Sequence, residues 1–212
     1  MKTYPFVPGE ADKALTDTGW EKNEETGKRE KKIDGEIVPM DLTLAVAEES
    51  PAISFLKNEF TNSLAEAGIT LTVVTMPWEK LLKQYYREEE RDCDMFFLAT
   101  NFEDDFNPSA WFDPSDDAQG VQNKTGIRSE ELYETAVDLV RTEPGDTLGY
   151  ATKWITFVEA MSEEMPFVPV YSNIYFDYYT ASLQGYDPTS VLSWADCIYD
   201  LSLEDVDITT ME

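Results

Sequence analysis

The sequence predicts an α/β fold, in which a parallel three-stranded sheet is covered by helices on both faces. Residues 41–46 and 70–76 alternate apolar with polar side chains, which is the pattern of strands. The segment 94–99 is apolar after its first residue, which suits a central strand buried on both faces. A helical pattern separates each pair of strands. Because β-α-β crossovers are right-handed, this order predicts one parallel sheet with helices on both sides.

The chain before the sheet is expected to begin with a short helix. Residues 10–18 place three apolar side chains on one face, and Gly19 is a natural stop. Residues 21–36 are almost wholly polar, with glycines in turn contexts, so they are expected to form an exposed hairpin or loop. The basic run at 28–32 is expected to be a solvated face.

The two crossover helices have recognisable ends. Ser50-Pro51 combines an N-cap with a proline at the first helical position, and the apolar repeat that follows closes at Gly68. Pro77 opens the second helix, which ends in the charged stretch 87–91. Trp78 at its start is expected to be packed.

Two more helices are predicted after the sheet, at about 129–141 and 146–164, and Pro166 ends the second. Trp154 falls on the apolar face of that helix and is expected in the core. Residues 106–123 have the composition of a loop, rich in proline, aspartate and aromatic residues.

The C-terminal part carries weaker patterns. Residues 167–171 and 174–179 are expected to be extended, the first limited by Pro169. The tail from 186 to 212 is weakly patterned.

Composition narrows the functional classes. The 212 residues carry 43 acidic and 16 basic side chains, a formal charge of −27, and no histidine. Nucleic acid and anionic membranes are therefore poor partners. Without histidine, the chain has no Ser-His-Asp or Cys-His machinery and no His-ligated zinc or copper. The apolar fraction of 42% is enough for a core, and the length fits one domain.

The cysteines and the search for targeting signals narrow the functional classes only slightly. Cys93 and Cys197 cannot make a four-thiolate site, and they are either free or paired. No run approaches the roughly 20 apolar residues that a membrane-spanning helix needs. The first residues lack an apolar stretch, so no signal peptide is expected within this sequence.

The topology itself points to a binding site. In open parallel sheets, ligands bind beyond the carboxyl ends of the strands, where segments 47–50 and 100–105 follow two of them. Acidic residues crowd 103–117, which favours capture of a cationic group, with a solvated loop and a calcium site as alternatives. Phe102 and Trp111 flank this loop and are candidates for stacking on a ligand.

Several short stretches occur in a characteristic order over residues 10–200. They are Ala14-Leu15 before Thr18-Gly19-Trp20, Gly27-Lys28-Arg29, Leu64-Ala65-Glu66-Ala67-Gly68-Ile69, Arg91-Asp92-Cys93-Asp94-Met95, Asn123-Lys124-Thr125-Gly126-Ile127 with Ser129-Glu130-Glu131-Leu132, and Met165-Pro166-Phe167-Val168-Pro169-Val170-Tyr171. In this order they resemble the C-terminal lobe of the family 5 extracellular solute-binding proteins of peptide ABC transporters.

The resemblance implies one lobe of a two-lobed, periplasmic-binding-protein-like clamp, so that residues 1–212 would be a fragment of a longer chain. The tail 186–212 would return toward the missing N-terminal lobe. The implied function is to capture oligopeptides and deliver them to ABC permease subunits, with no catalysis and no cofactor. The implied location is extracellular or periplasmic, with a lipoprotein anchor on the full-length protein. Alternatives are a carbohydrate- or metal-complex-binding relative, or an acidic extracellular interaction module without a small ligand.

The resemblance also implies a ligand-binding residue. In peptide-binding members an aspartate four residues before a proline pairs with the α-ammonium of the peptide, and Asp104 stands four before Pro108. Asp105 is its competitor. The expected ligand-binding residues are this acidic stretch and its neighbours: Asp104, Asp105, Asn101, Phe102, Glu103 and Trp111.

Overall fold

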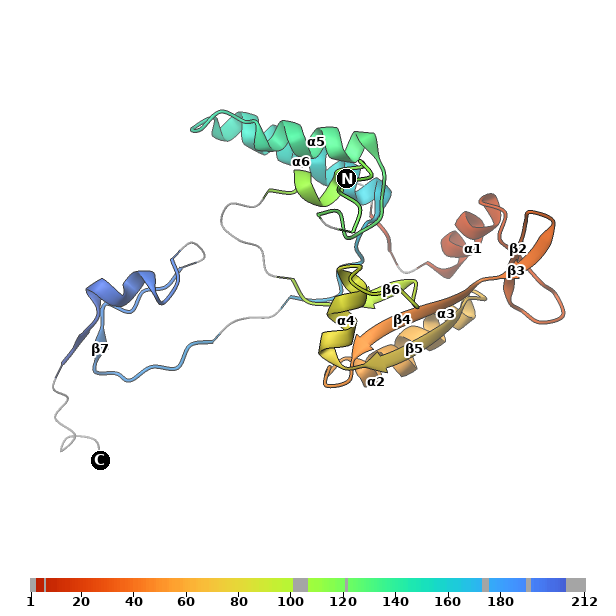
Figure 1. The fold of residues 1–212 in the computed structure, drawn as a ribbon, viewed down its shortest axis with the longest axis horizontal. Coiled ribbons are helices and arrows are strands. Elements are labelled where there is room, and N and C mark those ends of the chain that lie inside the picture. Colours follow the sequence, from red (N-terminus) through yellow and green to blue (C-terminus); the bar gives the residue numbers. More distant parts are fainter. Residues whose placement is uncertain are drawn as a thin grey trace. The chain divides into compact units, whose positions relative to one another are not determined.

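The computed structural model describes residues 3–5, 7–100, 107–120, 122–172, 176–189 and 192–204. The chain divides into two compact units (Figure 1). Unit 1 consists of residues 1–100 and 107–166, and unit 2 consists of residues 101–106 and 167–212.

The predicted parallel sheet is the centre of unit 1. Its strands are β4 (Asp41–Ala47), β5 (Thr70–Met76) and β6 (Met95–Phe97), and they pair in the order β5-β4-β6. Both pairings are parallel, as the β-α-β-α-β order predicted.

The expectation that 94–99 would be the central strand is wrong. The central strand is β4, whose consecutive residues Leu44, Ala45 and Val46 are all buried. In the described residues β6 pairs on one side only, and its three residues are half-buried. An apolar run alone does not distinguish a central strand from an apolar strand at the edge.

Helices cover both faces of the sheet. A continuous helical segment made of α2 (Ile53–Phe55), the π-helical turn η1 (Leu56–Phe60) and α3 (Thr61–Glu66) packs on the face that contains Leu44 and Val46. Helix α4 (Trp78–Tyr85) packs on the opposite face, where Leu81 contacts Ala45. Alternate β4 side chains thus serve two separate cores.

Local signals set the helix ends. Gly68 has φ +84°, and the Ile69 N–H donates to the Leu64 carbonyl at 3.0 Å, which ends the helical segment as predicted. At the start, Ser50 Oγ accepts from the Ala52 N–H at 3.3 Å in a turn, and helix α2 begins only at Ile53.

The N-terminal part combines helix α1 (Pro8–Asp17) with a small antiparallel sheet. This sheet contains β1 (Glu21–Lys22), β2 (Arg29–Ile33) and β3 (Glu36–Pro39), which pair in chain order. The segment expected as an exposed hairpin or loop is therefore a three-stranded meander.

Arg29 corrects the expectation of a solvated basic face. Its side chain is 1% exposed, while Lys28 and Lys32 are exposed as expected. Its guanidinium donates to the Ala67 carbonyl at 3.1 Å, to Thr16 Oγ1 at 2.9 Å and to the Trp20 carbonyl at 2.8 Å, and it pairs with Asp12. One side chain thus joins α1, β2 and the end of α3.

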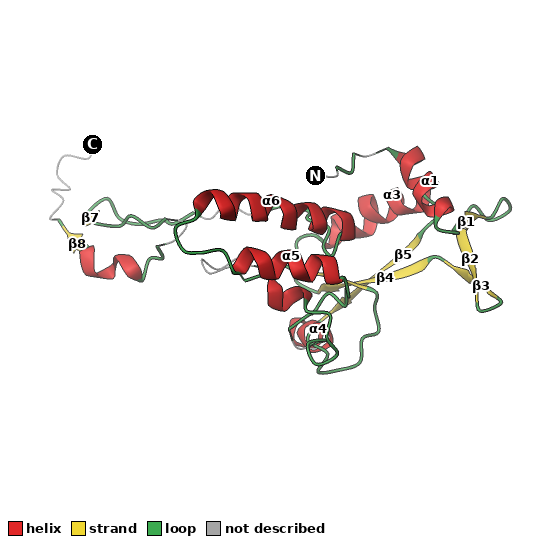
Figure 2. Cartoon of the chain, turned by 90° about the horizontal axis from the view of Figure 1, so that it is seen from above, coloured by secondary structure: helices red, strands yellow, loops and turns green. Residues whose placement is uncertain are grey.

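A helical hairpin completes unit 1. Helices α5 (Glu130–Val140) and α6 (Thr147–Glu164) lie side by side, and the short 3-10 helix η2 (Ser109–Phe112) packs on α5 (Figures 1 and 2). Ser129 caps α5 by accepting from the Leu132 N–H at 3.2 Å, and Asp146 caps α6 in the same way.

Trp154 on α6 is not in the core, contrary to expectation. It is 39% exposed and stacks on Tyr150 with an interplanar angle of 18°, while Phe157 takes the buried position against Phe112. Sequence periodicity identified the apolar side of α6 but not which of its residues the partner helix covers.

The loop between η2 and α5 is organised by one buried side chain. Asn123 is fully buried, and its amide nitrogen donates to the carbonyls of Asp113 at 3.0 Å and Ile127 at 2.8 Å. Its side-chain oxygen accepts from Thr125 Oγ1 at 2.8 Å and from the Gly126 N–H at 3.1 Å. All its hydrogen-bonding groups are therefore satisfied inside the protein.

Unit 2 has little regular structure in its described part. It contains the strand pair β7 (Leu183–Gln184) and β8 (Ser202–Leu203), with the 3-10 helix η3 (Asp196–Asp200) before β8. Residues 167–171 were expected to be extended, as were 174–179. The described residues of these segments, 167–171 and 176–179, form no strand pairing. Many aromatic side chains here are exposed, up to 95% for Tyr178 and 96% for Tyr199.

Replacing the buried Arg29 by methionine is expected to destabilise unit 1. The variant leaves the Ala67 and Trp20 carbonyls without their donor, which costs about 3 kcal/mol of unfolding free energy. Urea unfolding followed by tryptophan fluorescence measures the change. The matched control is Lys32→Met on the same strand, whose side chain is exposed. A loss as small for Arg29→Met as for the control would contradict the structural role.

Chymotrypsin is expected to make its first cuts between residues 167 and 199, where aromatic side chains are exposed and regular structure is sparse. A fragment containing residues 1–166 should accumulate, as mass spectrometry of an early digest would show. Trypsin is the control. No lysine or arginine follows Lys153, so trypsin cannot cut between residues 167 and 199. First cuts by chymotrypsin inside β4, α5 or α6 would show that unit 1 is the less stable part.

Candidate functional site

The carboxyl ends of β4 and β5 lie next to each other. We call this end of the sheet, where the parallel strands finish, the carboxyl edge. The Glu48 N–H donates to the Met76 carbonyl at 3.0 Å, so the loop after β4 is tied to the last residue of β5. The side chains of Glu48 and Glu49 are exposed. Two carboxylates are therefore presented at the edge that the topology nominated.

Trp78 joins this edge as the first residue of α4. It is 54% exposed, so the expectation that it would be packed is wrong. The buried residues of α4 are Leu81 and Gln84, and Trp78 lies roughly 90° around the helix from them. The sequence signal that could have found it is its position: it follows a strand's carboxyl end and starts a helix.

The strand β6 leads to the stretch that carries most of the expected ligand-binding residues. Ala99 and Thr100 are exposed at its end. Asn101, Phe102, Glu103, Asp104 and Asp105 follow directly, and they lie outside the described residues.

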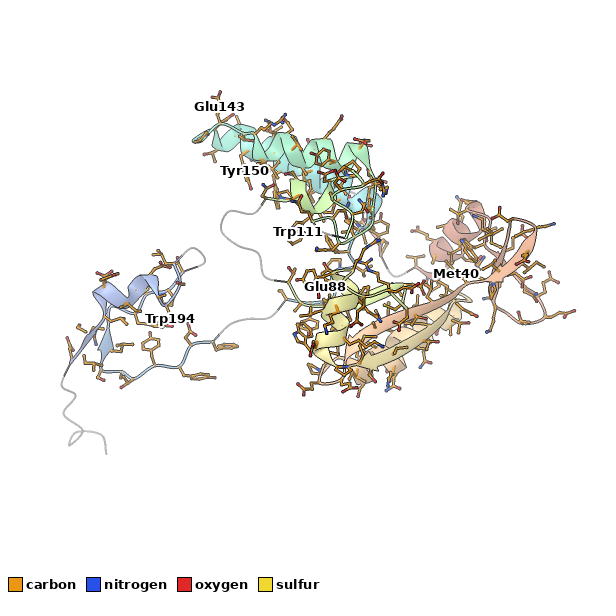
Figure 3. All side chains as sticks on the ribbon, viewed as in Figure 1. Met40, Glu88, Trp111, Glu143, Tyr150 and Trp194 are labelled. Atoms are coloured by element: carbon orange, nitrogen blue, oxygen red, sulfur yellow. The ribbon has the colours of Figure 1, made fainter. Side chains whose placement is uncertain are left out.

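Trp111, the remaining expected residue, lies on η2 (Figure 3). Its side chain is half-buried, and its backbone N–H donates to the Pro108 carbonyl at 3.0 Å. The following residue, Phe112, is buried against Phe157. The structure thus assigns Trp111 to the helical part of unit 1.

Two described acids of the acidic loop have structural partners. Asp113 accepts from the Ser115 N–H at 2.9 Å, and hydrogen bonding to Ser115 lowers the pKa of its carboxyl. Asp116 forms an ion pair with Arg128 at 2.7 Å. Within the described ranges no group of three or more potential metal-ligating residues comes together, so nothing there supports the calcium alternative.

The cysteines show no sign of reactivity. Burial raises the pKa of the Cys93 thiol, which disfavours the nucleophilic thiolate. Cys197 is buried in unit 2, and both thiols are free in the described part of the chain.

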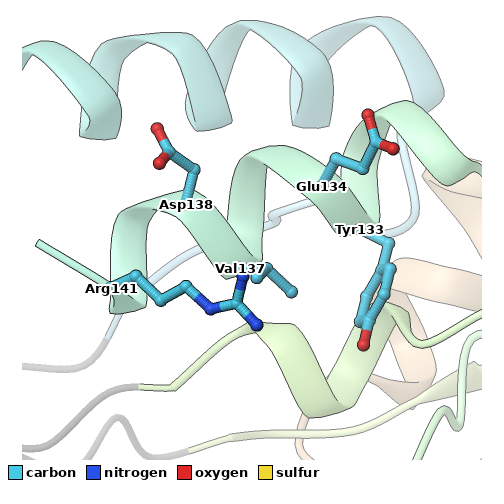
Figure 4. A pocket seen from close by; sticks show the side chains of 5 residues that line it. All are labelled: Tyr133, Glu134, Val137, Asp138 and Arg141. Atoms are coloured by element: carbon cyan, nitrogen blue, oxygen red, sulfur yellow. The ribbon is translucent and has the colours of Figure 1, made fainter.

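An open groove lies on the surface of α5 (Figure 4). Its volume is about 320 Å³, and it is lined by Tyr133, Glu134, Val137, Asp138 and Arg141. All five belong to α5 or its end, so this groove is separate from the carboxyl edge of the sheet.

No described helix is long and apolar enough to span a membrane.

Comparison with known proteins identifies the fold. No protein-family model and no curated protein matches the sequence. Among solved structures, an oligopeptide-binding protein from Thermus thermophilus in complex with a pentapeptide matches with a TM-score of 0.66 and 19% identity, over 78% of this chain and 29% of that one. NikZ from Campylobacter jejuni in complex with Ni(L-His) matches with a TM-score of 0.62 and 19% identity, over 78% and 32%.

A third structure extends the match to nearly the whole sequence. This structure is the periplasmic binding protein DppA from Helicobacter pylori in complex with the peptide STSA. The match covers 97% of this chain and 36% of DppA, with a TM-score of 0.56 and 18% identity. The chain spans about a third of the length of these proteins. The predicted α/β class is confirmed, and the chain has a fold similar to one part of these binding proteins.

Proposed function

We propose that this chain is a ligand-binding lobe of an extracellular solute-binding protein that captures oligopeptides for an ABC permease. The observation that carries the proposal is the fold match to two peptide-bound structures, over 78% and 97% of the chain. The ligand would be released unchanged, so the protein would act in transport and not as an enzyme.

The proposed binding surface is the carboxyl edge of the sheet. Its described part presents Glu48, Glu49 and Trp78. Asp104 would pair with the α-ammonium of the peptide, with Asp105 as its competitor. A charge-assisted hydrogen bond of this kind strengthens when closing lobes exclude water.

The proposed second lobe would come from the same, longer chain. Support comes from unit 2, where large apolar side chains such as Phe176, Tyr178, Trp194 and Tyr199 are exposed. Large exposed apolar surfaces are typical of interfaces. The tail 186–212 would return to the missing N-terminal lobe, and a lipoprotein anchor would hold the complete protein near its permease outside the cytoplasm.

A metal-complex ligand is the second candidate, because NikZ with Ni(L-His) matches the same share of this chain. This sequence has no histidine to coordinate the metal of such a complex. Mass spectrometry of the full-length protein as purified separates the candidates. Bound peptides support the proposal, whereas a bound metal chelate or sugar contradicts it.

Asp104→Asn in the full-length protein is expected to weaken peptides that have a free amino terminus by about 10-fold or more, since it removes a charge-assisted hydrogen bond. Amino-acetylated peptides should be much less affected. Isothermal titration with each matched pair measures the difference. Asp117→Asn, an exposed acid of the same loop, is the control. Equal losses for both peptide forms would remove the role assigned to Asp104.

The 212-residue chain alone is expected to bind peptides weakly, because one lobe offers only part of the enclosing surface. Titration of the same peptides into this chain should give little or no heat. Tight binding by the isolated chain would contradict the two-lobed clamp while leaving peptide capture itself intact.

A further inference from the structure

Three basic side chains gather where α4 ends, although the chain has only 16 basic residues against 43 acidic ones. Arg87 and Arg91 follow the helix, and Lys124 comes from the loop that Asn123 organises. Figure 3 marks this end of α4 by Glu88. We call Arg87, Arg91 and Lys124 the cationic cluster.

Arg91 holds the helix end and the loop together. Its guanidinium donates to the carbonyls of Gln84 at 3.1 Å, Tyr85 at 2.7 Å and Lys124 at 3.1 Å. It also lies 5.3 Å from the centre of the Phe96 ring. Its donors are therefore occupied by carbonyls, and its charge lies near an aromatic ring. No described carboxylate forms an ion pair with it.

Lys124 is fixed in a similar way. Its Nζ donates to the Gly120 carbonyl at 2.9 Å and lies 4.8 Å from the centre of the Tyr86 ring. Burial lowers the pKa of Lys124, and the positive charge of Arg91 lowers it further. The pKa of Arg91 is likewise lowered by burial and by Arg87. The charge of Arg91 thus interacts unfavourably with the charges of Arg87 and Lys124.

Arg87 has an exposed side chain that lies next to two glycines of the neighbouring loop. Its φ of +57° is in the left-handed region, which is strained for a residue with a side chain. Its stem lies over Gly120, where an added Cβ would come 2.3 Å from Arg87 Cδ. One guanidinium nitrogen reaches within 3.5 Å of the Cβ position of Gly126. The side chain is exposed, and no described carboxylate forms an ion pair with it.

Three acids follow Arg87 directly in the sequence. Glu88, Glu89 and Glu90 are exposed, and Glu89 faces Lys83 at 3.9 Å. The carboxylate of Glu88 acts on the cluster, since it raises the pKa of Lys124 against the effects of burial and of Arg91.

We propose that the cationic cluster is a binding site for an oxyanion, either a carboxylate or a phosphate. The Arg87 guanidinium offers a planar set of donors that suits both groups, and its side chain lies next to Gly120 and Gly126. Arg91 and Lys124 add positive potential behind it. The site lies away from the proposed ligand edge, because α4 starts at the carboxyl end of β5 and ends near the start of β6. It therefore does not depend on the proposed transport function.

The test uses the 212-residue chain and nuclear magnetic resonance. Sodium phosphate and sodium acetate are titrated separately at constant ionic strength, and the amide signals of Gly120 and Gly126 are followed together with the Arg87 Nε–H. Saturable shifts with a millimolar Kd are expected for at least one anion. Tighter phosphate binding assigns a phosphate ligand, and tighter acetate binding assigns the acidic side chain of a partner.

Arg87→Gln is expected to weaken the binding at least about fivefold. Arg87→Gly, which suits the positive φ, should give the same loss and guards against misfolding of the first variant. The matched control is Arg141→Gln, which removes an exposed arginine elsewhere in unit 1. Linear, unsaturated shifts, or equal effects of the Arg87 and Arg141 variants, would overturn the site.

Discussion

Burial of β4 is the constraint on which the rest of unit 1 depends. A strand with neighbours on both sides and helices on both faces must be apolar on both faces, as Leu44, Ala45 and Val46 are. Parallel pairing then requires a crossover on each side, and the two crossovers supply the α2–α3 segment and α4. The carboxyl ends of the strands consequently meet at one edge, which is where Glu48, Glu49 and Trp78 are presented.

The few basic residues of this acidic chain hold its parts together. Arg29 joins α1, β2 and the end of α3, and Arg91 joins α4 to the loop that precedes α5. Both guanidinium groups donate mainly to backbone carbonyls at the ends of structural elements. An arginine with five donors can satisfy several such carbonyls at once, which a lysine cannot do in the same plane.

Local patterns predicted most of the fold. The alternation of β5, the Gly68 stop and the starts of α5 and α6 are contained within a few residues, so the sequence shows them directly. The errors concern long-range burial. The edge position of β6, the burial of Arg29 and the exposure of Trp78 depend on which surfaces partners cover. The candidate site was predicted in part: topology nominated the edge, Trp78 was missed there, and 101–105 lie outside the described residues.

The buried Asn123 has a consequence for how the protein can be made. With Lys124 and Thr125 it forms a triplet that eukaryotic oligosaccharyltransferase modifies. Glycan attachment acts on the nascent chain, before the loop has closed over the amide. Because the folded loop uses both the nitrogen and the oxygen of that amide internally, a sugar there would block closure. A bacterial host avoids this conflict, whereas a eukaryotic secretory host would call for Thr125 to be replaced first.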